Sequence, residues 1–279
     1  MRAERQVEMT SLTQPRRGRF VRHAAAIIIV AAIALFAACA TRGESVPSPQ
    51  VGLYELRIYT AADGKMSELD ARFRDHTIGL FRKHGMTPIA FFHPENPDDH
   101  RLIYLMGYKD RAARDAAWSA FATAPEWSEV RGASEAHGAL TSKIESLFLV
   151  PTDYSPALDL TSAAPPRYFE LRTYTTNPGK LENLHTRFRD HTLGLFAKHG
   201  MTNMLYWRPT ADQPAMDNKL VYLMAYPDKA ARNAAWAAFG ADEAWKKVAA
   251  DSQVDGPILT ATGGVVSVEM RPTDYSPLN

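Results

Sequence analysis

The chain has few groups of the kind that carry out chemistry. Cys39 is its only cysteine, so no disulfide can form within the chain. The sequence also has no GxSxG elbow for a nucleophilic serine, no glycine-rich loop that cradles phosphate and no dinucleotide-binding fingerprint. These absences exclude nucleophilic hydrolysis and nucleotide-dependent chemistry as leading functions, and we assign no catalytic residue.

The N-terminal apolar run is too short to span a bilayer. Residues 24–38 are fifteen small or apolar residues, whereas a membrane-spanning helix needs roughly 20. Arginines precede the run, which is typical of a secretory signal. The sequence LFAAC at 35–39 resembles a bacterial lipobox, in which the cysteine is lipidated and becomes the mature N-terminus.

We therefore expect a signal peptide over 1–38, lipidation of Cys39 and a polar tether over 39–52. The protein would be exported and lipid-anchored on the periplasmic or extracytoplasmic face of a membrane. Two alternatives stay open: a plain cleaved signal in which the cysteine is incidental, and an uncleaved membrane anchor.

A basic surface is also missing. Without residues 1–38 the chain keeps 26 basic and 29 acidic residues, so the mature protein is mildly acidic. This balance gives no basic face for nucleic acid, and we expect no nucleic-acid partner. With 46% hydrophobic and 23% charged residues, the composition is that of a folded globular protein.

What the chain does have is a long internal repeat. The sixteen residues 72–87 return at 187–202, which is 115 positions later, with two changes. Aligned at this offset, 54–94 and 169–209 share 23 identities in 41 positions. This self-similarity predicts a duplicated domain. We place the copies at 53–156 and 167–279, with an Ala-, Ser- and Pro-rich linker at 157–166.

Each copy predicts the same order of elements. In the first copy, residues 54–59 alternate as a strand, a long amphipathic helix ends at Gly85, and 89–93 and 102–108 form a strand pair. Asp110 is a good N-cap for a second helix, and 144–150 is the last strand. The copies are therefore ferredoxin-like βαββαβ units with both helices on one sheet face.

The other face of each sheet needs cover as well. Packing the two units sheet to sheet gives an α+β fold, an intramolecular α+β barrel with its helices outside. In this arrangement we expect Leu56 and Ile58 to meet the helices and their alternating neighbours to point into the space between the units.

Several segments in this order resemble one family. YELRIYT at 54–60, GKMSELDARFRDHT at 64–77, KHGMT at 83–87, LIYLMGYKDRAARDAAW at 102–118 and Trp127 are similar to a NIPSNAP domain, within the dimeric α+β barrel superfamily. The resemblance covers about 54–153 and 169–274. It implies the barrel fold, and no cofactor or catalytic residue set is established for the family as a whole. Members of the family are linked to organelle quality control and vesicle-related interactions.

The first strand of each copy supplies our candidate ligand-binding residues, in the barrel interior: Glu55, Arg57, Tyr59, Glu170, Arg172 and Tyr174. They could orient the polar or anionic head of a small ligand, with Phe92, Trp207 and Tyr104 as apolar walls. Equally, they could form an ion-pair network that only stabilises the fold. By analogy with cofactor-independent oxygenases and isomerases of the superfamily, such a set could also assist proton transfer.

Metal binding by histidines is the less favoured hypothesis. The residues concerned are His76, His84, His191 and His199. Two histidines eight residues apart lie about 12 Å apart along a helix, too far to share an ion. We expect packing and helix-end roles for them, beside the apolar stripe of the helix, and no metal. Packing roles are also expected for the tryptophans of the second helix and its following turn: Trp118, Trp127, Trp236 and Trp245.

The function predicted from the sequence is non-catalytic binding of a small molecule or a protein partner by a membrane-tethered protein. The alternative is a cofactor-independent small-molecule enzyme, oxygenase- or isomerase-like, with its site between the two halves. Whether the two-unit chain associates further is left open.

Overall fold

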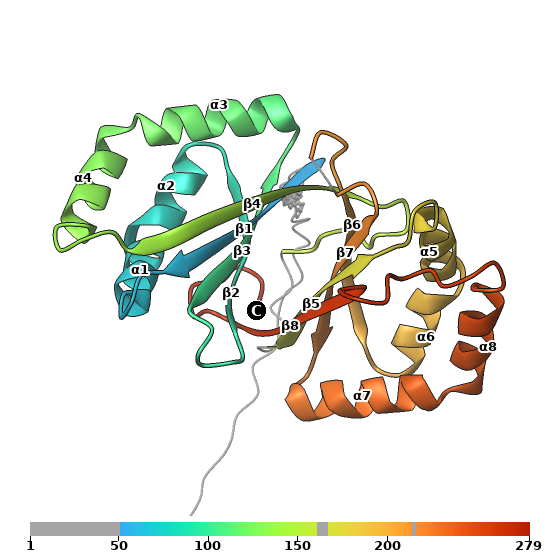
Figure 1. The fold of residues 1–279 in the computed structure, drawn as a ribbon. Helices are drawn as coiled ribbons and strands as arrows, with labels where there is room; N and C mark the ends of the chain where they lie inside the picture. The colour runs from blue at the N-terminus through green and yellow to red at the C-terminus, as the bar shows by residue number, and fades with distance from the viewer. Residues whose placement is uncertain (1–50, 161–166, 214–215) are drawn as a thin grey trace, which may run out of the picture. The chain divides into compact units, whose positions relative to one another are not determined.

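The computed structural model describes residues 51–160, 167–213 and 216–279 (Figure 1). The predicted signal peptide, Cys39 and most of the tether lie outside the described residues. Both repeats belong to one compact unit, Val46–Asn279. In the described part of the chain, no helix has the length and hydropathy of a membrane span.

The two halves repeat one order of elements. The first half consists of β1 (Leu53–Ala61), α1 (Met66–Arg72), η1 (Phe73–Thr77), α2 (Ile78–Lys83), β2 (Thr87–Pro94), β3 (Arg101–Tyr108), α3 (Arg111–Ala122), α4 (Pro125–Ser134) and β4 (Thr141–Pro151). The second consists of β5 (Tyr168–Thr175), α5 (Leu181–Arg187), η2 (Phe188–Thr192), α6 (Leu193–Lys198), β6 (Thr202–Pro209), β7 (Lys219–Tyr226), α7 (Lys229–Ala241), α8 (Glu243–Asp251) and β8 (Val265–Pro272).

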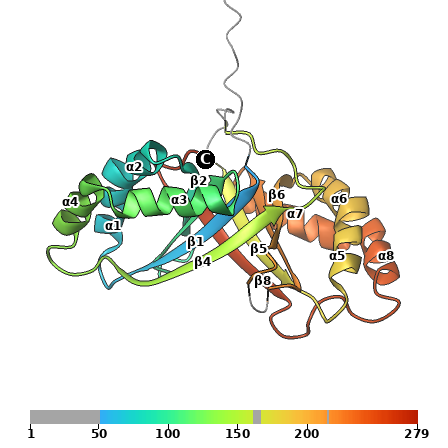
Figure 2. The same ribbon diagram turned by 90° about the horizontal axis from the view of Figure 1, so that it is seen from above.

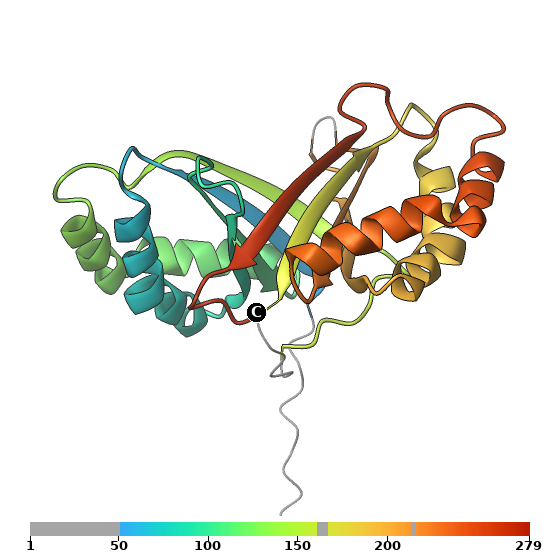
Figure 3. The same ribbon diagram turned by 90° about the horizontal axis from the view of Figure 1, so that it is seen from below.

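The eight strands close into one barrel in the order β1-β3-β2-β8-β5-β7-β6-β4. Each half supplies four antiparallel strands, and β2 with β8 and β4 with β6 join the halves over short registers such as Phe92↔Pro272 and Leu149↔Pro209. Figures 2 and 3 show the helices of each half on the outer side of its own strands, with β8 running beside β5. The predicted α+β barrel is confirmed.

Local chemistry explains where the second helix of each half begins. Asp110 accepts a hydrogen bond from the backbone N–H of Ala113 at 2.8 Å, and Asp228 accepts one from that of Ala231 at 2.7 Å. These bonds satisfy donors that the first helical turn leaves free. After each of these helices the chain forms a further helix, α4 or α8, which is longer than the short turn that the sequence predicts.

The prediction of which face of β1 meets the helices is wrong. Leu56 and Ile58 belong to the core between the two sheets, whereas Tyr59 packs in the core between the sheet and the helices of its half. Both faces are buried, so alternation alone does not choose between them. The barrel interior is closed to water by both sheets, so the apolar face of β1 packs there. The charged face of β1 points to the helices, whose side chains can pair with it.

A π-helical segment interrupts the first helix of each half and corrects the predicted place of the histidines. In η1 the Thr77 hydroxyl donates to the carbonyl of Arg72 at 3.0 Å. The i→i+5 spacing adds a residue to the turn, which brings Ile78 into the buried stripe and leaves His76 exposed. His191 is exposed for the same reason in η2. Among the described residues no group of three or more His, Cys, Asp or Glu is placed to hold a metal ion.

The segments after β4 and β8 cross to the opposite half. Tyr154, after β4, lies 2.7 Å from Nδ1 of His185 through its hydroxyl. Tyr275, after β8, donates to Asp70 at 2.6 Å. The repeated sequence PTDYSP therefore ties each half to the first helix of the other.

Candidate functional site

The six residues predicted to bind a ligand do not line the barrel interior. They form two equivalent clusters, each between β1 or β5 and the helix that follows the third strand of its half. We call them the first cluster, around Glu55 and Arg57, and the second cluster, around Glu170 and Arg172. Their position corrects our prediction, because the charged face of β1 and β5 points to the helices.

Glu55 is fully buried and saturated with donors. It accepts hydrogen bonds from Arg57 at 2.5 Å, from Arg114 of α3 at 2.8 and 2.9 Å, and from the Ser146 hydroxyl of β4 at 2.6 Å. Trp118 of α3 adds an indole N–H at 3.2 Å. Burial raises the pKa of Glu55, but the Arg114 hydrogen bonds and the Arg57 charge outweigh it and lower the pKa to about 2.

Arg57 also has all its donor nitrogens paired within the cluster. Its Nε donates to the Tyr104 hydroxyl at 2.8 Å and Nη2 to the Tyr59 hydroxyl at 3.2 Å, while Nη1 binds Glu55. The guanidinium carbon also lies 4.3 Å from the centre of the Trp118 ring. Every nitrogen of this arginine therefore has a partner within the cluster.

The second cluster repeats the first. Glu170 accepts from Arg172 at 2.6 Å, from Arg232 of α7 at 2.7 Å and from Trp236 at 2.7 Å. Tyr226 adds a bond at 2.9 Å, and the pKa of Glu170 is also held at about 2. Satisfied networks of this kind hold a helix on a sheet. Of our three interpretations of these residues, the geometry supports the ion-pair network.

The predicted apolar walls are separated by the sheet. Phe92 and Trp207 lie in the barrel interior, whereas Tyr104 lies on the helix side. The interior is filled with apolar side chains from both halves, and its aromatic rings are in contact: Phe92 with Phe169 at 4.9 Å and Tyr54 with Trp207 at 5.5 Å between ring centres. Of the three predicted walls only Tyr104 lies with the predicted polar residues, where its hydroxyl accepts from Arg57; Phe92 and Trp207 lie on the other side of the sheet.

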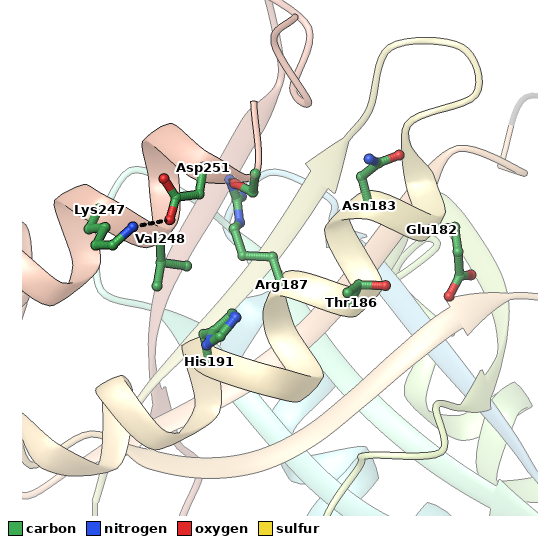
Figure 4. Close-up of a pocket in the computed structure, with 9 residues that line it drawn as sticks. Glu182, Asn183, Thr186, Arg187, His191, Lys247, Val248 and Asp251 are labelled. Atoms are coloured by element: carbon green, nitrogen blue, oxygen red, sulfur yellow. Dashed lines mark hydrogen bonds and ion pairs between the residues drawn. The ribbon is translucent and has the colours of Figure 1, made fainter. Parts of the chain in front are cut away.

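A different place has the features of a binding site. We call it the second-half cleft: an open hollow of about 530 Å³ between α5 with η2 and α8. Thr186 and Arg187 line it from α5, His191 from η2, and Lys247 and Val248 from α8 (Figure 4). Figure 4 shows Arg187 reaching from α5 toward α8.

Arg187 is a buried cation with poor partners. Only 5% of its surface is exposed. Its Nη1 lies 3.4 Å from the Ser252 hydroxyl, its Nε has no hydrogen-bond partner among the described residues, and its guanidinium carbon lies 5.3 Å from the centre of the Trp245 ring. Burial lowers the pKa of Arg187, yet arginine stays protonated in proteins. A positive charge is therefore held at the base of the cleft.

The first half has an equivalent cleft of about 600 Å³ with a different charge arrangement. Arg72 corresponds to Arg187, but its Nη1 donates to the Glu135 carboxylate at 2.8 Å. Glu135 also accepts from Arg131 at 3.0 Å. The Nε atom is unpartnered in both arginines, so the carboxylate is what distinguishes them.

The second half has Gln253 where the first has Glu135, because the repeat offset is 118 after the longer loop. Gln253 bonds to the backbone near it and not to Arg187: it donates to the carbonyl of Ala249 at 2.9 Å and accepts from the N–H of Ile258 at 3.3 Å. The sequence carried this signal in the Glu135/Gln253 difference. Recognising it required knowing that the segment after Trp245 packs beside the first helix.

Comparison with known proteins agrees with this architecture. The NIPSNAP family model matches residues 54–156 and 169–277. A solved structure of an anthrone oxidase-like protein is 11% identical, covers 81% of this chain and 93% of its own, and has a TM-score of 0.52. The comparison with curated proteins gives no match.

Two solved NIPSNAP proteins each match one domain. One from Agrobacterium tumefaciens is 26% identical and covers 37% of this chain and 96% of its own, with a TM-score of 0.34. A NIPSNAP domain protein from Burkholderia xenovorans is 22% identical and covers 38% and 99%, with a TM-score of 0.34. Because the family model covers both halves of the barrel, the chain belongs to the NIPSNAP family and carries its domain twice.

Proposed function

We propose that this protein is an exported, membrane-tethered binding protein that holds a small molecule in the second-half cleft without transforming it. The observation that carries the proposal is Arg187, a cation with 5% exposure at the base of an open cleft, which forms no ion pair with a carboxylate among the described residues and has only the Ser252 hydroxyl as a hydrogen-bond partner. A buried charge without a partner is costly and suggests a group supplied from outside.

The cleft has a size suited to this role. Its volume of about 530 Å³ falls within the roughly 300 to 1,000 Å³ of small-molecule sites. Polar groups of Arg187, His191 and Ser252 meet the apolar side chain of Val248 there. None of these side chains forms a nucleophile and base pair of the sort that covalent catalysis needs.

The tether is supported by the sequence alone. An arginine-rich segment, a fifteen-residue apolar run and the LFAAC sequence precede the barrel. Lipidation of Cys39 would hold the binding domain at the membrane face. Metabolic labelling with a fatty acid tests this: the wild type should be labelled and a Cys39→Ser variant should not, whereas equal labelling of both would refute the anchor.

The enzyme alternative has one observation in its favour, the fold shared with an anthrone oxidase-like protein. At 11% identity this likeness concerns the fold alone. The apolar, filled interior between the sheets offers no polar group of the predicted set for such chemistry. We therefore keep binding as the leading function.

Plugging the cleft tests the proposal. Thr186→Trp places a large ring at the cleft, and Ala71→Trp is the matched control at the equivalent position of the first-half cleft. Small molecules released on denaturing the purified full chain are identified by mass spectrometry. We expect a molecule that co-purifies with the wild type and Ala71→Trp and is lost from Thr186→Trp. Equal recovery from all three, or its conversion to a product on incubation, would contradict the proposal.

A further inference from the structure

The chemistry of the cleft narrows the class of molecule it takes, on the basis of the binding function proposed above. The base of the cleft presents the Arg187 guanidinium and, beside it, the Ser252 hydroxyl. A guanidinium is a planar fork of N–H donors that matches the two oxygens of a carboxylate. Ser252 can add a third donor, since its hydroxyl rotates to suit.

The first half shows which counter-ion this framework accepts. At the equivalent position Arg72 also has a serine nearby, Ser134 at 3.4 Å, and there the counter-charge is a carboxylate, Glu135. The two halves thus share the arginine and the serine and differ in the carboxylate. In the second half an amide, Gln253, replaces it and donates elsewhere.

The other charged groups of the second-half cleft are already paired. Lys247 binds Asp251 at 2.6 Å, and Glu182 lies 4.0 Å from Arg189. Both carboxylates are largely exposed, so water screens them from the base of the cleft. Arg187 is the cation that the cleft leaves without an acidic partner among its lining residues.

The two clefts also differ at their rims. Lys247 and Asn183 stand where the first half has Glu129 and Glu68. Asp75 adds a further acid to the first-half cleft. The second half thus has a cation and an amide in place of two first-half carboxylates, and its own additional acids, Glu182 and Asp251, are exposed and paired with cations.

We propose that the second-half cleft binds the carboxylate of a small organic acid, with Arg187 as its counter-ion and Ser252 as a further donor. The acid supplies to Arg187 the charge that Glu135 supplies to Arg72. The apolar part of the acid lies against the side chain of Val248.

Benzoate and benzamide are suitable probes, because they share a shape and differ in charge. The full chain is titrated with each by calorimetry at constant ionic strength, with phosphate as a third arm. We expect one benzoate site per chain and benzamide affinity weaker by about tenfold or more, since charge-assisted bonds are roughly twice as strong as neutral ones. Equal affinity of the two probes, or binding of phosphate in place of benzoate, would overturn the carboxylate assignment.

Two variants test the residues. Gln253→Glu gives Arg187 an internal carboxylate and should weaken benzoate about tenfold or more, as should Arg187→Met, which removes the cation. Glu135→Gln, the opposite change at the equivalent position, should leave the affinity of the second-half cleft for benzoate unchanged, and any binding that it opens beside Arg72 would be measured as a second site. Benzoate binding that is indifferent to both second-half variants would overturn the inference.

Failure of the inference can be told from failure of the proposed function. If benzamide binds as well as benzoate and Thr186→Trp abolishes both, the cleft is a binding site of another chemistry. If Thr186→Trp leaves the binding of both probes unchanged, the second-half cleft is not the binding site and the proposed function fails.

Discussion

The two halves of the barrel share one fold, and their clefts differ most clearly in the partner of a buried arginine. Each half packs a buried arginine between its first helix and its last helix, α4 or α8, beside a tryptophan of that last helix, Trp127 or Trp245. The first half neutralises Arg72 with Glu135, and the second leaves Arg187 without such a partner. Duplication thus supplies an internal reference: what the halves share is required by the fold, and what they do not share points to function.

The largest expected effects lie where the halves agree. Glu55→Ala or Glu170→Ala would leave the two arginines of its cluster without their buried carboxylate. Breaking a buried ion pair from one side costs about 3 to 5 kcal/mol. Urea unfolding of the full chain should show similar losses for the two variants. A loss below about 1 kcal/mol in one half only would show that the clusters are not equivalent.

Acid should remove the same stabilisation. The pKa values of Glu55 and Glu170 are lowered to about 2 in the folded chain. A depressed carboxyl pKa gives stability that is present above the unfolded pKa of about 4.3 and is lost as pH falls through the folded value. We expect the free energy of unfolding to decline between about pH 4.5 and 2, with a shallower decline in Glu55→Gln. An unchanged slope in that variant would contradict the assignment.

Replacing the buried arginine of each cleft should change the stability of the chain by different amounts in the two halves. Arg72→Met removes the more buried of the two arginines that bind Glu135, leaving only Arg131, and should cost about 1 to 3 kcal/mol. Arg187→Met removes a charge with no acidic partner among the described residues and fills similar space, so its cost should be near zero or negative. Chemical unfolding of both variants checks this contrast, and equal losses would mean that Arg187 is neutralised in solution.

The smallest effects on the free energy of unfolding are expected from adding or removing the carboxylate that pairs with the cleft arginine. Gln253→Glu should raise the free energy of unfolding by about 1 kcal/mol, because the new pair is charge-assisted and partly buried. Glu135→Gln should lower it by a similar amount. Thermal denaturation of the two variants in one buffer is the measurement, and a shift of the same sign in both would break the comparison between the halves.

Much of the fold could be predicted from the sequence. The repeat gave the two units, and alternation on 54–59 with helical spacing on the next segment gave the element order. The face of β1 was predicted the wrong way round, since both faces are buried and the charged face therefore does not mark the side away from the helices. The place of His76 was missed because a π turn changes the phase of a helix and leaves no plain mark in the sequence.

Less of the candidate site than of the fold could be predicted from the sequence. Glu55, Arg57 and their copies were identified as a buried charged group, and the contacts that saturate them come from α3, α7 and the last strands. Those contacts depend on tertiary packing, which single-strand alternation does not contain. Arg187 stayed hidden because it lies in a segment identical in both halves; only the distant Gln253 makes it different.

The most direct test of the central claim is a crystal structure of the full chain soaked with benzoate. We expect the carboxylate within hydrogen-bond distance of the Arg187 guanidinium, with no benzoate beside Arg72. Benzoate found beside Arg72 or in the barrel interior instead, with the second-half cleft empty, would contradict it.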